Sequence, residues 1–87
     1  MIPMKNKVLV QLIVPDMEES YDIYIPINRK VGNVIGLLSK AVSELTNGVY
    51  PISKKTTLYN AETGESYLMD SVILDTNIRN GTKLILF

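Results

Sequence analysis

The chain has no cysteine and no histidine. Without cysteine it can form no disulfide, no thiolate metal site and no thioester, and a small domain without disulfides is consistent with the cytoplasm. Histidine is the commonest acid–base and metal-binding side chain, so serine triads and the usual zinc sites cannot be built. We therefore expect a protein that is not an enzyme and that holds no cofactor and no metal.

An excess of one charge is also missing, because nine basic and nine acidic side chains cancel. Binding to nucleic acid through counterion release needs a clustered positive face. The sequence has only two short basic pairs, Arg29-Lys30 and Lys54-Lys55. We therefore expect no nucleic-acid partner, although folding could still bring the two pairs together into a local basic patch.

Long hydrophobic runs are absent as well. The apolar run over residues 8–14 is too short to span a bilayer, lacks a signal-peptide cleavage site and leads into the polar turn at residues 15–19. With 87 residues, of which 46% are hydrophobic, the chain has the size and composition of one soluble domain. We expect a single domain over residues 1–87, without direct membrane insertion.

The first third has the alternation of a β-hairpin. Over Lys7–Val14 the even positions are all apolar and the odd ones include polar residues, so we expect the even side to face the core. Residues 15–19 have turn chemistry, and residues 20–25 alternate again with Tyr21, Ile23 and Ile25 on one face. The acidic side chains of the turn are expected to be solvated; a calcium site would need more oxygen ligands.

The middle of the chain predicts one amphipathic helix. Asn28 is a suitable N-terminal cap, and Asn47-Gly48 followed by Pro51 is a good C-terminal stop. Six apolar residues at helical spacing form the stripe that we expect to be buried: Val31, Val34, Ile35, Leu38, Val42 and Leu45.

The last third predicts short strands. Residues 56–59 and 66–69 are expected to form two strands joined by a turn, and Asp75 is expected to cap a short turn through Asn77. Asn80-Gly81 then turns the chain into a closing strand over residues 83–87, and this turn explains the sequence Asn80-Gly81-Thr82 better than glycosylation does. The order ββαββ-turn-β predicts an α+β fold in which a mixed sheet packs on one helix.

This order of elements resembles the β-grasp fold of ubiquitin-like proteins. The stretch from residue 73 to residue 86 carries the likeness: an aliphatic residue, one variable residue, Asp75, two variable residues, Ile78, two more, Gly81 and alternating aliphatics. The spacing from Ile25 to Val31, Val34 and Leu38 is also similar to the passage from the second strand into the helix. The resemblance implies the strand order second, first, fifth, third.

Within that fold, Tyr21-Asp22-Ile23-Tyr24-Ile25-Pro26 and the helix start at residues 31–35 are similar to the YukD/EsaB group. These are small ubiquitin-like proteins of Gram-positive bacteria that are encoded with the type VII (WXG-motif, Ess/Yuk) secretion system. The resemblance implies a cytoplasmic accessory component that acts on or beside the membrane-embedded ATPase core. Its partner would be the secretion ATPase or another type VII component.

The end of the sequence departs from ubiquitin. Ubiquitin and the sulfur carriers end in a flexible tail with two glycines, whose carboxylate is activated. This sequence ends at Phe87, inside the predicted last strand, and the YukD/EsaB group likewise generally lacks the two glycines. We therefore expect neither conjugation nor sulfur transfer. A modifier or sulfur carrier is the alternative if the sequence is truncated, and a homo-oligomerising scaffold is another.

The leading prediction is a protein-binding module that uses the outer face of the sheet. With the β-grasp strand order, six apolar side chains are expected to lie next to one another there: Leu9, Ile13, Tyr24, Tyr59, Ile85 and Phe87. A contiguous apolar patch usually marks an interface, either with a partner or with a second copy. A second candidate is a strip of small residues on the helix, Gly32, Gly36, Ser39 and Ser43, although we expect the loop after Pro51 to pack on it.

Overall fold

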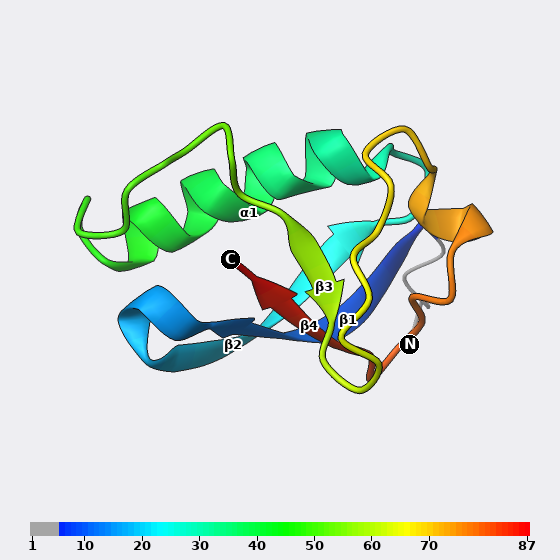
Figure 1. Cartoon of the computed structure of the whole chain (residues 1–87), viewed down its shortest axis with the longest axis horizontal. Coiled ribbons are helices and arrows are strands. Elements are labelled where there is room, and N and C mark those ends of the chain that lie inside the picture. The colour runs from blue at the N-terminus through cyan, green and yellow to red at the C-terminus, as the bar shows by residue number, and fades with distance from the viewer. Residues whose placement is uncertain (1–5) are drawn as a thin grey trace.

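The structure is a computed structural model that describes residues 6–87. Seven elements follow one another in the order β1 (Lys7–Val14), η1 (Pro15–Met17), β2 (Glu19–Pro26), α1 (Val31–Leu45), β3 (Leu58–Asn60), η2 (Ile73–Asp75) and β4 (Lys83–Leu86), in which η denotes a 3₁₀ helix. Figure 1 shows α1 lying across one face of the sheet, while the other face is left uncovered. The molecule therefore has two layers, and the core lies between them.

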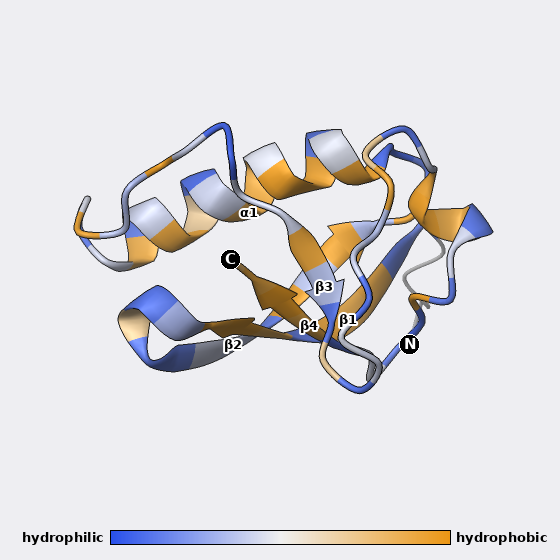
Figure 2. Ribbon diagram, viewed as in Figure 1, coloured by the Kyte–Doolittle hydropathy of each residue, from blue (hydrophilic) through white to orange (hydrophobic). Residues whose placement is uncertain are grey.

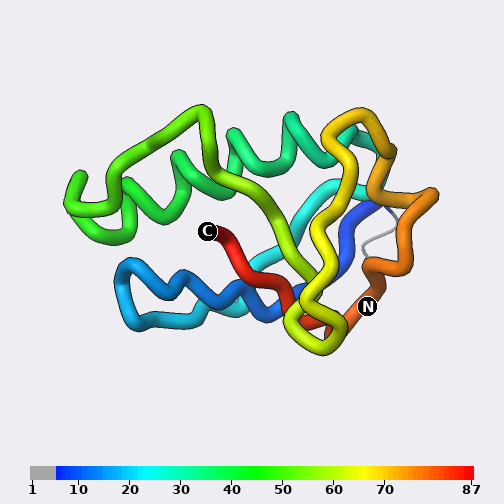
Figure 3. Tube along the Cα trace, in the orientation of Figure 1, coloured from blue at the N-terminus to red at the C-terminus, as the bar shows by residue number. Residues whose placement is uncertain are grey.

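The strands form one mixed sheet in the order β2-β1-β4-β3. Strand β1 is antiparallel to β2 and parallel to β4, and β3 is antiparallel to β4. The closing strand therefore lies beside the first one in the middle of the sheet, as the Cα trace in Figure 3 shows. The predicted α+β fold and strand order are confirmed, with four strands in the sheet.

The core follows the predicted alternation and the predicted helix stripe. The even positions of β1 are all buried, and so are Val31, Val34, Ile35, Leu38 and Val42 of α1. Figure 2 shows the apolar sides of the helix and the sheet turned toward each other. The sixth residue of the stripe was wrongly predicted: Leu45, the last residue of α1, is 59% exposed, and the core residue contributed just after the helix is Tyr50.

A distant segment caps the start of α1. The N-cap residue is Lys30, not Asn28, and its side chain makes no capping hydrogen bond. The N–H groups of Val31 and Gly32 instead donate to the carbonyls of Ser71, at 2.8 Å, and Met69, at 2.9 Å. These bonds satisfy two of the four N–H groups that a helix leaves unpaired at its first turn.

The same segment explains why the strand predicted over residues 66–69 does not form. Ser66 makes an isolated bridge to Tyr59. The chain then turns toward α1, where the carbonyl of Met69 accepts the hydrogen bond from the Gly32 N–H. The partner strand is also shifted, because β3 begins at Leu58 and ends at Asn60 instead of covering residues 56–59.

The turns predicted at Asn47-Gly48 and Asn80-Gly81 are confirmed, and the cap predicted at Asp75 is not. Helix α1 ends at Leu45, and the chain turns away from it at Asn47 and Gly48, which have φ values of 55° and 82°. Gly81 has a φ of 88° in the turn before β4, and the side chain of Asn80 accepts a hydrogen bond from the Leu9 N–H at 2.8 Å. Asp75 does not cap a turn: it is the last residue of η2, which has no side-chain cap.

Candidate protein-binding surface

Four of the predicted residues form one cluster on the uncovered face of the sheet. Ile13 is the register partner of Ile85, which is in turn the partner of Tyr59. Phe87 lies two residues beyond Ile85 on the same side of the strand and is 61% exposed. Two backbone hydrogen bonds between Phe87 and Thr57 hold it in the plane of the sheet. We call Ile13, Tyr59, Ile85 and Phe87 the outer cluster.

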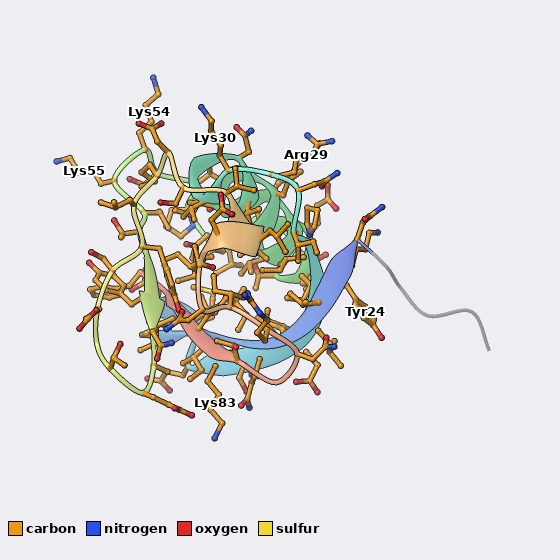
Figure 4. All side chains as sticks on the ribbon, turned by 90° about the vertical axis from the view of Figure 1, so that its right-hand side faces the viewer. Tyr24, Arg29, Lys30, Lys54, Lys55 and Lys83 are labelled. Atoms are coloured by element: carbon orange, nitrogen blue, oxygen red, sulfur yellow. The ribbon has the colours of Figure 1, made fainter. Side chains whose placement is uncertain are left out.

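The other two predicted residues lie apart from this cluster. Leu9 and Tyr24 are register partners of each other, at the far end of the hairpin. Between them and the outer cluster runs a polar row, in which Gln11 is paired with Asp22 on one side and Lys83 on the other. The prediction of one continuous patch of six residues is therefore wrong for Leu9 and Tyr24. Figure 4 shows Tyr24 and Lys83 extending from the sheet at separate places.

The outer cluster has the composition of a small binding site for protein. Its centre is aliphatic and half-buried, and its two aromatic side chains can add large contact areas without many rotatable bonds. A hollow of about 410 Å³ borders Ile13 and is lined by the charged residues Glu18, Glu19 and Lys83 among others. An apolar centre beside a charged rim is the usual anatomy of a protein interface.

The acidic turn between β1 and β2 carries no metal cluster. Within residues 6–87, no three histidine, cysteine, aspartate or glutamate side chains come close enough together to hold a metal ion. Asp16 lies in η1, and Glu18 adopts a left-handed conformation with a φ of 51°.

Among residues 6–87, no helix has the length and hydropathy needed to span a membrane.

The two basic pairs come from separate segments on the helix side of the molecule. Arg29 and Lys30 precede α1, whereas Lys54 and Lys55 belong to the loop that follows it, and all four are exposed. Figure 4 shows their side chains spread along the helix side of the molecule and directed outward. The expectation that nucleic acid is not a partner stays a prediction.

The small-residue strip of α1 is only partly covered. At Gly32 an added Cβ atom would lie 3.4 Å from the carbonyl oxygen of Met69, whereas at Gly36 it would meet nothing within 4 Å. A cleft of about 470 Å³ separates this part of the helix from residues of the loop after Pro51, including Ile52 and Lys54. The expected packing of that loop onto the strip is therefore wrong at Gly36.

Sequence reasoning missed a third surface, a groove of about 540 Å³ between β2 and α1. Its helix wall includes Leu37 and Ala41, and Leu37 is 49% exposed. These two residues lie beside the buried stripe on the helix, so their apolar character was the available signal. Recognising the groove also required the position of β2 at the edge of the sheet.

The comparisons with known proteins agree on the fold. No family model and no curated protein matches the sequence. Among solved structures, the ubiquitin-like domain of the Mycobacterium tuberculosis type VII secretion system protein EccD1 is similar, with a TM-score of 0.73 and 12% identity over 92% of this chain and 96% of that one. The chain has a ubiquitin-like β-grasp fold.

Two further structures have the same fold in different settings. A chain of the ESX-5 inner membrane complex matches with a TM-score of 0.77 and 12% identity, over 94% of this chain but only 21% of that one. A chain of a toluene 4-monooxygenase complex matches with a TM-score of 0.75 and 10% identity, over 92% and 95% of the two chains. At these identities the likeness extends to the fold, and function must be argued from the surface.

Proposed function

We propose that this chain is a non-catalytic, non-conjugated ubiquitin-like module that binds a protein partner as a cytoplasmic accessory component of type VII secretion. The observation that carries the proposal is the outer cluster. It gathers two aliphatic and two aromatic side chains from three strands on the one sheet face that α1 leaves uncovered. Burying such a cluster against a partner would gain roughly 25 cal/mol for each Å² of apolar surface removed from water.

Two further findings support the secretion setting. The β-grasp fold occurs in the type VII secretion protein EccD1 and in a chain of the ESX-5 inner membrane complex. The sequence Tyr21-Asp22-Ile23-Tyr24-Ile25-Pro26 is similar to the YukD/EsaB group, which is encoded with the same class of secretion machine. The proposed partner is accordingly the secretion ATPase or another component of that machine, which would recruit the chain to the inner face of the membrane.

Deleting the gene tests this function. We expect the deletion strain to stop exporting WXG-motif proteins and to regain export when the wild-type gene is returned, as measured by immunoblotting of culture supernatants. The gene should also lie beside genes for an FtsK-type ATPase and WXG-motif proteins. Unchanged export would contradict the proposal. A covalent adduct on the native protein, detected by intact-mass measurement, would instead indicate a modifier or sulfur carrier.

A further inference from the structure

We propose that the free edge of β2, together with the groove beside it, binds an extended segment of a different protein as an added strand. The bound segment would carry apolar side chains at alternate positions and an acidic residue at the end near Lys7 and Arg29. This surface is separate from the outer cluster, so the two proposals stand or fall independently.

Backbone hydrogen bonding defines the open edge. The N–H of Leu9 donates to the Asn80 side chain at 2.8 Å, and the carbonyl of Leu9 accepts from the Gly81 N–H at 2.8 Å. Leu9 therefore does not use these groups toward its register partner Tyr24, and the Tyr24 N–H and carbonyl must point to the opposite side. By the alternation of the ladder the same holds for Asp22 and Ser20. Because β2 is an edge strand, these backbone groups face outward.

The opposite edge of the sheet is already in use. On β3, the Leu58 carbonyl accepts from the Tyr67 N–H at 3.0 Å, and the Asn60 N–H donates to the Glu65 carbonyl at 2.9 Å. The chain thus covers the outer side of β3 with its own backbone. Within residues 6–87, β2 is the sheet edge that a foreign strand can extend.

The groove supplies contacts for side chains. It lies along β2 and is lined by Ile23 and Ile25 from the strand and by Val34, Leu37, Leu38 and Ala41 from α1. Successive side chains of a strand point to opposite faces, so every second residue of an added strand would lie on the helix side, over the groove. Main-chain bonds would supply affinity, and the apolar groove would select alternate aliphatic residues.

Charge gives the bound segment a polarity. The charged residues that line the groove are Lys7 and Arg29, and no acidic residue lines it. Lys7 is paired with Pro26 at the end of β2, and Arg29 follows that strand, so both charges belong to the same end of the groove. An acidic residue of the ligand is therefore favoured at this end.

A second copy of the chain fits this edge poorly. A symmetric antiparallel pairing of two β2 strands centred on Asp22 would place the two Asp22 carboxylates opposite each other, which is destabilising. Moving the centre to Ile23 or to Tyr24 would place Pro26, which has no N–H, opposite Ser20 or Asp22. A charged residue and a proline, such as Asp22 and Pro26, protect edge strands from self-association. The expected ligand is therefore a strand of different sequence.

Selection from a display library of random ten-residue peptides on the immobilised chain tests the proposal. We expect enriched peptides to alternate apolar residues and to carry an acidic residue at one end. Binding should slow hydrogen exchange at the amides of Ser20, Asp22 and Tyr24 at least tenfold. Leu37→Glu should weaken binding at least tenfold, whereas the matched control Leu45→Glu, an exposed leucine of the same helix outside the groove, should not change it.

Two further variants address the strand geometry and the charge. N-methylation of every second amide of an enriched peptide should abolish binding in one register and leave it unchanged in the other, because only alternate residues bond to β2. Arg29→Glu should remove the preference for an acidic end, whereas Lys40→Glu, which makes the same charge change outside the groove, should not. The double variant Ile85→Thr, Phe87→Thr should still bind the peptide.

The proposal would be overturned by a selection that enriches no peptide. Equal tolerance of N-methylation in both registers, or equal effects of Leu37→Glu and Leu45→Glu, would also overturn it. If the enriched peptides no longer bind the Ile85→Thr, Phe87→Thr variant, their binding site is the outer cluster and the proposal is wrong. If the secretion role fails and the peptide results hold, only the proposed function is wrong.

Discussion

Replacing Ile85 and Phe87 together with threonine is expected to abolish export of WXG-motif proteins while the chain remains folded. The two side chains occupy the centre and the end of the outer cluster, and Phe87 contributes its largest exposed aromatic surface. Central aromatic and aliphatic residues of interfaces often contribute about 2 kcal/mol each, which is roughly thirtyfold in affinity per residue. Threonine retains a high strand propensity, so β4 should still form. The measurement is export in a deletion strain that carries the variant gene.

The control replaces Leu9 with threonine. Leu9 is an apolar residue on the same sheet face, but the polar row of Asp22, Gln11 and Lys83 separates it from the outer cluster. We expect this variant to export normally. Normal export by the Ile85 and Phe87 variant, or equal defects in both variants at equal protein levels, would contradict the assignment of the site.

Replacing Leu12 with alanine is expected to lower the free energy of unfolding by about 2–5 kcal/mol. Leu12 of β1 is fully buried between the sheet and the helix. Truncating its side chain leaves a cavity in the core, which also contains Val10, Val14 and Leu84. A fold of 87 residues has a total stability of roughly 4–13 kcal/mol, so this change alone can bring the chain close to unfolding. Urea unfolding followed by circular dichroism measures the effect.

The neighbouring substitution Ile13→Ala provides the comparison. Ile13 is on the opposite side of the same strand and is only half-buried, so we expect a loss of about 1 kcal/mol with an unchanged dependence on urea. Equal losses at residues 12 and 13 would contradict the register on which both the core and the outer cluster depend. A one-residue shift would exchange the two faces of β1.

The elements with strong local patterns could be predicted from the sequence. The alternation in β1 and the helical spacing from Val31 to Val42 each identify a buried side, and both sets of residues are buried in the structure. Gly48 and Gly81 mark turns because their positive φ values suit a residue without a Cβ atom. These features depend on residues close together in the sequence, so their periodicity was sufficient.

Features that depend on distant residues could not be predicted in this way. The cap of α1 comes from the carbonyls of Met69 and Ser71, almost forty residues away, and using them prevents the expected strand over residues 66–69. Local capping preferences favoured Asn28, because side-chain propensity contains no information about a carbonyl from another segment. The position of β3 shifted for the same reason, since its pairing with β4 sets its limits.

The sheet face of the six predicted residues could be inferred from the sequence, but their division into two groups could not. All six outward residues lie on the expected face, yet the register places Gln11 between Asp22 and Lys83 and divides the set. The alternation of each strand is local, whereas the alignment between strands is not. The groove beside β2 could not be inferred from the sequence, because it is created by the distance between an edge strand and a helix.

Site-specific photocrosslinking in the native bacterium tests the central claim most directly. A photoreactive phenylalanine analogue is placed at position 85 or 87 and, as a control, at position 68, where an exposed leucine lies outside the outer cluster. We predict that positions 85 and 87 form an adduct with a type VII secretion component, identified by mass spectrometry, and that position 68 does not. The absence of such an adduct at both positions, or an equally strong one at position 68, would contradict the account.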